Sequence, residues 1–130
     1  MHSKFIKQHI VLPNEIDALQ HVNNVVYLSW IQDVANDHWT LLKEGHKTDA
    51  YVWVVVRHEI DYLRQALLGD AVTITTWVGE TQGVKSVRHV DISKEGKLLV
   101  KAQTTFCLLD AKTFKPARIP EDILAILESK

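Results

Sequence analysis

The hydrophobic and polar positions of this chain follow a helical period from Val25 to about Glu44 and a period of two after Gly45. Between residues 25 and 44, large side chains recur at helical spacing and share one face, whereas the opposite stripe is polar. The shared face holds Tyr27, Trp30, Ile31, Val34, His38, Leu41 and Leu42. This pattern predicts one long helix that stops at Gly45, with Asn23 or Asn24 as its N-cap.

Alternating apolar and polar residues predict strands in the rest of the chain. The predicted strands span residues 5–12, 51–63, 72–78, 84–92 and 98–109. Turns are expected at 69–70, from Gly79 to Gly83 and at 94–97, and Pro120 suits the start of a short helix over 121–128. One long helix against an antiparallel sheet of about five strands is an α+β arrangement. One helix cannot cover both faces of such a sheet, and a strand as apolar as Val52–Val56 therefore predicts a dimer partner.

Length and composition limit the classes of protein to which the chain can belong. Its 130 residues predict a single domain, 1–130, and its net charge of −1 gives no reason to expect nucleic acid or a membrane as partner. The lone Cys107 excludes an intrachain disulfide, so a cytoplasmic protein is expected, with Cys107 as a packed thiol. No His-Glu-x-x-His, serine elbow or phosphate-loop motif occurs, and we expect no metal.

The polar stretch before the predicted helix holds the candidate chemistry. Asp17 there could act as a general base or nucleophile, or it could simply bond to nearby backbone. The helix N-terminus at Asn23 and Asn24 offers N–H donors for developing negative charge. His21 could bind substrate, orient Asp17 or donate a proton, or its ring could be a structural group bonded to a backbone carbonyl.

Motifs along nearly the whole chain resemble the hotdog-fold acyl-CoA thioesterases of the 4-hydroxybenzoyl-CoA thioesterase type. The most specific is Asp17-x-x-x-His21-Val22-Asn23-Asn24-x-x-Tyr27-Leu28-x-Trp30. Ile60-Asp61-Tyr62-Leu63-Arg64, Leu68-Gly69-Asp70 and Pro116-x-x-Ile119-Pro120 follow in the family's order. The resemblance implies a central helix wrapped by a curved antiparallel sheet, a homodimer that can form a tetramer, and active sites at the dimer interface.

The resemblance also implies roles for particular residues. Asp17 would be the catalytic carboxylate, the Asn24 N–H would polarise the thioester carbonyl, and His21 and Asn23 would shape the loop. The expected reaction is hydrolysis of an acyl-CoA, with coenzyme A as part of the substrate and no further cofactor. Two alternatives stay open, namely a dehydratase or isomerase that uses His21 as proton carrier and a non-catalytic module that binds acyl thioesters.

Substrate contacts are expected from residues outside the loop as well. The resemblance places Lys85, Ser86 and Arg88 near the pantetheine arm, where basic groups could pair with the phosphates of CoA; the alternative is solvated strand surface. Arg57 and Arg64 are weaker candidates. Tyr27 and Trp30 fit the helix core better than an acyl pocket, although an interface pocket could use such residues for both.

Three positions depart from the family pattern. Gln20 stands where Gly is common, and Glu15 where a second Asp is frequent. Gln32-Asp33 replaces an acidic pair on the helix, which favours Asp17 as the catalytic carboxylate and leaves Asp33 as the second candidate.

Overall fold

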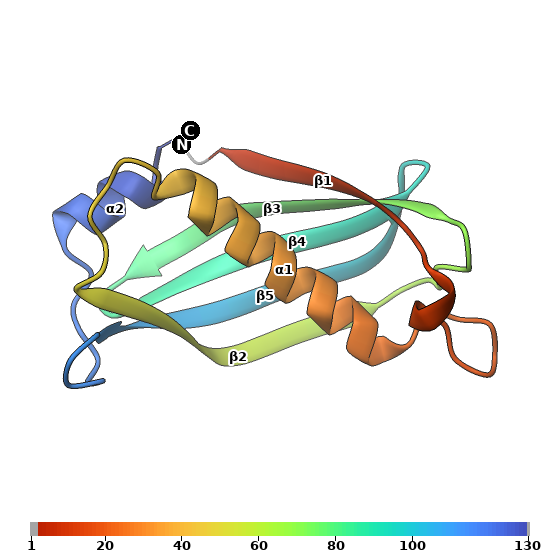
Figure 1. The fold of residues 1–130 in the computed structure, drawn as a ribbon, viewed down its shortest axis with the longest axis horizontal. Coiled ribbons are helices and arrows are strands. Elements are labelled where there is room, and N and C mark those ends of the chain that lie inside the picture. Colours follow the sequence, from red (N-terminus) through yellow and green to blue (C-terminus); the bar gives the residue numbers. More distant parts are fainter. Residues whose placement is uncertain (1–2, 130) are drawn as a thin grey trace.

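One long helix lies across one face of a five-stranded antiparallel sheet in the computed structural model, which describes residues 3–129 (Figure 1). The strands are β1 (Lys4–Ile10), β2 (Tyr51–Tyr62), β3 (Ala71–Gln82), β4 (Lys85–Lys94) and β5 (Lys97–Asp110). A single 3-10 turn, η1 (Pro13–Glu15), leads towards the long helix α1 (Asn24–Leu42), and α2 (Glu121–Leu127) closes the chain. The α+β prediction with one long and one short helix is confirmed.

The strand order is β1-β3-β4-β5-β2, so β1 and β2 form the two edges of the sheet. Short hairpins join β3 to β4 and β4 to β5, whereas α1 lies between β1 and β2 in the sequence and crosses the sheet between its two edges (Figure 1). This crossing places the N-terminal end of α1 beside the 66–70 turn and its C-terminal end beside α2.

The core lies between α1 and the sheet because both contribute an apolar face. Tyr27, Ile31 and Val34 of α1 are almost fully buried against strand residues such as Ile74 and Ile92. A second cluster joins the end of α1 to α2 through Leu42, Leu108 and Ile123. The predicted core position of Tyr27 and Trp30 is confirmed, at 1% and 5% exposure.

The end of β3 differs from the prediction. A turn was expected from Gly79 to Gly83, but the strand continues to Gln82 and the turn consists of residues 83–84, where Gly83 has a φ of +66°. The register of β3 against β4 shifts between Val78 and Thr81, so residues that were expected to form a turn lie in an irregularity within the strand. A glycine inside a strand can therefore mark a bulge as well as a strand end.

The other boundaries move by a few residues. The first strand stops at Ile10 instead of residue 12, because η1 begins at Pro13. The helix α1 ends at Leu42, before Gly45, which has a φ of +77°. Asn23 is the N-cap, and its side-chain oxygen accepts the Val25 N–H at 3.1 Å.

Candidate active site

The loop between η1 and α1 is folded around Asp17. Oδ1 of this residue accepts the N–H groups of Leu19 at 2.9 Å and His21 at 3.2 Å, and its own N–H donates to the His21 carbonyl at 2.8 Å. These bonds leave Oδ2 without a hydrogen bond to any residue from 3 to 129. Asp17 Oδ1 thus makes the backbone hydrogen bonds considered from the sequence, whereas Oδ2 stays available and its catalytic role stays a prediction.

Gln20, which stands where glycine is common in the family that the chain resembles, has a backbone conformation that suits glycine. Its φ is +66°, a left-handed conformation that costs a side chain more than it costs glycine. Its N–H donates to the Asp17 carbonyl at 3.0 Å, so the turn keeps its shape despite the substitution. Gln20 is exposed, and its side chain therefore meets solvent instead of the core.

The start of α1 presents a free N–H at the end of this loop. Asn24 is the first helical residue, and within the described part of the chain its N–H has no acceptor. The first N–H groups of a helix have no intrahelical partner, and they carry the positive end of the helix dipole. An oxygen bearing negative charge would be stabilised at this position.

The turn over residues 66–70 supports the loop from behind. Val22 donates its N–H to the Ala66 carbonyl at 3.1 Å, and His21 pairs with Leu67 in a single antiparallel bridge. The Ala66 N–H donates to the Tyr27 hydroxyl at 2.9 Å, which ties the turn to α1. Tyr27 is therefore buried, and its hydroxyl is engaged by the Ala66 N–H. Its contact with substrate stays a prediction.

The His21 side chain is half-buried and makes no hydrogen bond to residues 3–129. The expected bond from its ring to a backbone carbonyl is absent, so this residue shapes the loop through its backbone alone. No carboxylate within the described ranges pairs with the ring, although a dehydratase would call for such a pair.

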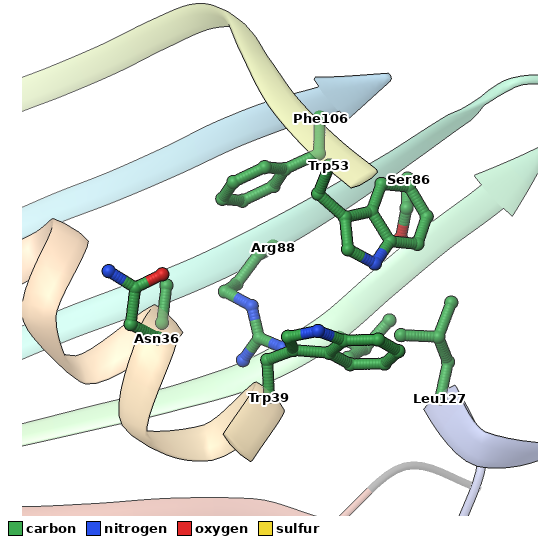
Figure 2. A pocket seen from close by; sticks show the side chains of 9 residues that line it. Asn36, Trp39, Trp53, Ser86, Arg88, Phe106 and Leu127 are labelled. Carbon is green, nitrogen blue, oxygen red and sulfur yellow. The ribbon is translucent and has the colours of Figure 1, made fainter. Parts of the chain in front are cut away.

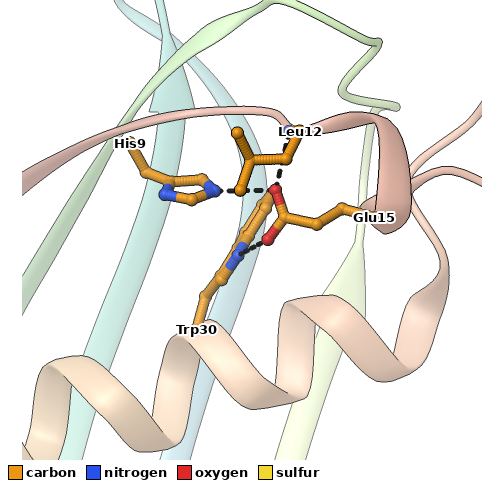
Figure 3. A network of polar contacts seen from close by, with 4 residues as sticks. All are labelled: His9, Leu12, Glu15 and Trp30. Atoms are coloured by element: carbon orange, nitrogen blue, oxygen red, sulfur yellow. Dashed lines mark hydrogen bonds and ion pairs between the residues drawn. The ribbon is translucent and has the colours of Figure 1, made fainter.

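Glu15 holds η1 against α1 and was missed as a key residue by sequence reasoning (Figure 3). Its carboxylate accepts hydrogen bonds from the Leu12 N–H at 2.8 Å and the Trp30 indole N–H at 2.9 Å, and it contacts His9 Nε2 at 2.8 Å. Burial raises the pKa of Glu15, but the bonds from His9, Leu12 and Trp30 outweigh it and leave the pKa lowered. The one available signal was its acidic side chain three residues after Leu12, the spacing of a capping box.

Asp33, the second catalytic candidate, lies on an exposed face of α1. It follows Asn24 by nine residues, which is roughly 14 Å along a helix axis at 1.5 Å per residue. The structure therefore does not bring Asp33 to the helix N-terminus where the Asn24 N–H is free.

The three predicted CoA contacts on β4 do not share one environment. Lys85 is exposed at the start of the strand, whereas Ser86 and Arg88 are each 6% exposed and face α1. Ser86 and Arg88 are therefore neither solvated residues on the strand surface nor part of an open site for phosphate. Their side chains line a pocket beneath the C-terminal half of α1, together with Trp39, Trp53 and Phe106 (Figure 2).

Two kinds of feature are absent from residues 3–129. They contain no group of three or more His, Cys, Asp or Glu side chains arranged to hold a metal ion. None of the helices formed by these residues has the length and apolar character needed to cross a membrane.

Comparison with known proteins gives a consistent result over nearly the whole chain. The family model of the Thioesterase-like superfamily matches residues 11–127. The long-chain acyl-CoA thioesterase FadM of Escherichia coli (strain K12) is 29% identical over 123 residues, which cover 87% of this chain and 89% of FadM.

Solved structures agree with the sequence matches. The probable thioesterase YbaW from Escherichia coli superposes with a TM-score of 0.83 at 27% identity, covering 95% of this chain and 96% of YbaW. A thioesterase from Thermus thermophilus, complexed with coenzyme A and Zn, superposes with a TM-score of 0.79 at 27% identity, covering 94% of this chain and 90% of its own. These likenesses confirm the hotdog fold expected from the resemblance.

Proposed function

The chain belongs to the Thioesterase-like superfamily, and on that premise we propose that it hydrolyses acyl-CoA thioesters at the loop before α1, with Asp17 as the catalytic carboxylate. The class of enzyme, acyl-CoA thioesterase, follows from the family match and from the similarity to FadM. One observation supports the assignment of residues. Asp17 Oδ2 and the Asn24 N–H, at the two ends of one short loop, both lack partners among residues 3–129.

The proposed chemistry uses the acceptor and the donor together. Asp17 takes a proton from water as the hydroxyl oxygen adds to the thioester carbonyl, and the Asn24 N–H stabilises the negative oxygen that forms. Collapse of this intermediate breaks the carbon–sulfur bond, and the CoA thiolate leaves with the proton. Direct attack by Asp17, through a mixed anhydride that water then hydrolyses, gives the same products.

Two further parts of the proposal concern the assembly and the substrate. We propose a homodimer, because β2 is an edge strand with exposed valines, and the tetramer stays a prediction. Exposed Lys85 is the group on β4 that we propose to pair with a CoA phosphate. A cytoplasmic location also stays a prediction, resting on the single cysteine.

The decisive experiment compares thiol release from short aliphatic, long aliphatic and aromatic acyl-CoAs. Asp17→Asn should lower kcat by about a hundredfold or more while the circular dichroism spectrum is unchanged, because general-base catalysis contributes that much. Asp49→Asn, at an exposed position outside the site, is the matched control and should match the wild type. A folded Asp17→Asn protein with full activity would contradict the assignment.

Two more variants separate the alternatives. Asp33→Asn should keep most activity, and its loss would move the catalytic role to α1. His21→Ala should be less damaging than Asp17→Asn, whereas the reverse order would favour the dehydratase or isomerase. Saturable acyl-CoA binding with no thiol released would favour a binding module.

A further inference from the structure

The pocket under the C-terminal half of α1 combines apolar walls with one buried cation (Figure 2). Trp39 comes from α1, Trp53 from β2, Val78 from β3 and Phe106 from β5, and together they line a small, half-open pocket with a cavity volume of about 50 Å³. The guanidinium of Arg88 points from β4 towards α1 into this space. Such a combination is typical of small-molecule sites, where a few polar groups orient a ligand among apolar walls.

Arg88 is only 6% exposed, yet no carboxylate of residues 3–129 lies within the 4 Å of an ion pair. Its Nη1 donates to His38 Nδ1 at 2.7 Å and to the Thr76 hydroxyl at 3.2 Å. Burial lowers the pKa of Arg88 to about 10, so the side chain is still charged at neutral pH. A buried charge without a counter-charge is costly, and proteins usually pair such groups.

The neighbours of Arg88 hold it in place without neutralising it. Burial, followed by the charge of Arg88, lowers the pKa of His38 to about 4, so His38 is neutral and can accept with Nδ1. The Ser86 hydroxyl is engaged with the Thr81 hydroxyl at 2.8 Å. The Nε and Nη2 groups of Arg88 make no hydrogen bond to the described residues, and no fully buried side-chain nitrogen there lacks a partner. This second edge of the guanidinium is therefore open to the pocket.

We propose that this pocket binds a small carboxylic acid as its carboxylate, paired with the open edge of Arg88, with its apolar body between Trp39, Trp53 and Phe106. Arginine and carboxylate match as two planar groups joined by parallel hydrogen bonds. The apolar walls select a ligand with a single small anionic head and disfavour a highly charged one, which would be poorly solvated there. The cavity volume of about 50 Å³ limits this body to a few carbon atoms, so short-chain carboxylates fit this description.

The pocket is separate from the Asp17 loop of the same protomer. Asn36, which lines it, follows Asn24 by twelve residues, and this spacing corresponds to roughly 18 Å along the axis of α1. The inference rests on the contacts of Arg88 and does not depend on the proposed hydrolysis.

Titration calorimetry of the full chain with butanoate tests the proposal, with 1-butanol and inorganic phosphate as comparison ligands. We expect saturable binding of butanoate and at least about tenfold weaker binding of butanol, because the alcohol cannot form the charged pair. Phosphate should not displace butanoate. Absence of saturable butanoate binding, equal binding of butanol, or displacement by phosphate would overturn the carboxylate site.

Two pairs of variants locate the site. Arg88→Met should weaken butanoate binding about tenfold or more, whereas Arg57→Met removes an exposed arginine elsewhere and should not. Asn36 is exposed, so substitution there should leave the fold intact even if Arg88→Met does not fold. Asn36→Glu places a competing carboxylate near Arg88 and should weaken binding, with Asn36→Gln as the neutral control. Unchanged binding in Asn36→Glu, or in folded Arg88→Met, would refute the site.

Discussion

At the scale of single residues, the buried polar groups of this protein are held by partners that lie far away in the sequence. Glu15 joins β1, η1 and α1 through His9, Leu12 and Trp30. His38 accepts from Arg88, fifty residues later. Both Glu15 and His38 have a lowered pKa, and the pH dependence of stability follows from each.

Glu15→Gln should lower the free energy of unfolding by about 1–3 kcal/mol near pH 7, because buried donors lose a charged acceptor. The folded pKa of Glu15 lies below the unfolded value of 4.5, so its contribution is complete above that value and is lost as the pH falls further. Urea unfolding near pH 7 and again below 4.5 should show the difference between wild type and variant shrinking. Glu44→Gln, at an exposed position, is the control, and a difference that does not change with pH would contradict this account.

His38 should make the fold sensitive to mild acid. The unfolded chain binds a proton at His38 near pH 6.5, but the folded chain binds it only near pH 4. Stability should therefore fall as the pH drops through this window. In His38→Gln the fall should be shallower, as measured by thermal unfolding near pH 7 and pH 5.

Burial also lowers the pKa of His58. His58 therefore contributes equally to the pH dependence of stability in the wild type and in His38→Gln, and it does not affect the difference between them. His46→Gln removes an exposed histidine, and its stability should fall with pH as steeply as that of the wild type. Equal slopes for wild type and His38→Gln would show that His38 does not titrate as described.

At the scale of elements, the bulge in β3 depends on a glycine that touches the neighbouring strand. A Cβ added at Gly79 would lie 2.6 Å from Nε2 of His89 and 3.1 Å from the Val87 carbonyl oxygen. The His89 ring is stacked on Trp77 with centroids 5.4 Å apart, so it cannot move away without loss of that contact. Gly79 is thus required by close packing between β3 and β4.

Gly79→Ala should destabilise the protein by about 1–3 kcal/mol, the usual cost of overpacking. In a His89→Ala background the same substitution should cost less, because the clashing ring is gone. A double-mutant cycle by denaturant unfolding measures this coupling, which we expect to be about 1 kcal/mol. Equal costs in both backgrounds would instead assign the effect to the Val87 carbonyl or to the bulge itself.

At the scale of the whole molecule, the two edges of the sheet differ. Strand β2 presents the consecutive valines Val54, Val55 and Val56, at 37%, 39% and 52% exposure, and a register shift at its centre. Strand β1, at the opposite edge, exposes Ile6 and Ile10 between charged and polar residues. Charged residues on an edge strand oppose pairing with another chain, so β2 is the edge we propose for the dimer.

The double variant Val54→Lys/Val56→Lys should weaken dimer formation by at least about tenfold, because two charges would have to be buried or repelled at the interface. Light scattering coupled to size exclusion, over a range of concentrations, measures the mass. Ile6→Lys adds a charge to the other edge and should leave the mass unchanged. A dimer that persists in the double variant would place the interface elsewhere.

Local sequence patterns were sufficient to predict the α-helices and strands of this protein, but not the 3-10 turn η1. The stripe from Tyr27 to Leu42 and the alternation around Ile92 are visible in the sequence because one face of each element is buried. The loop motif likewise predicted Asp17 as the candidate carboxylate. Strand ends were harder to predict, since the sequence around Gly79 does not distinguish a glycine that begins a turn from one that lies in a bulge.

The sequence by itself determined the helix, the alternating strands, and through its motifs the family and the loop that holds the candidate chemistry. Only the tertiary structure decided which side chains meet. It placed Glu15 against Trp30, and it turned Arg88 inward onto His38 when the sequence suggested a contact for phosphate. The physical reason is that periodicity fixes the face on which a residue lies, whereas its partner depends on strand order, register and the angle at which α1 crosses the sheet.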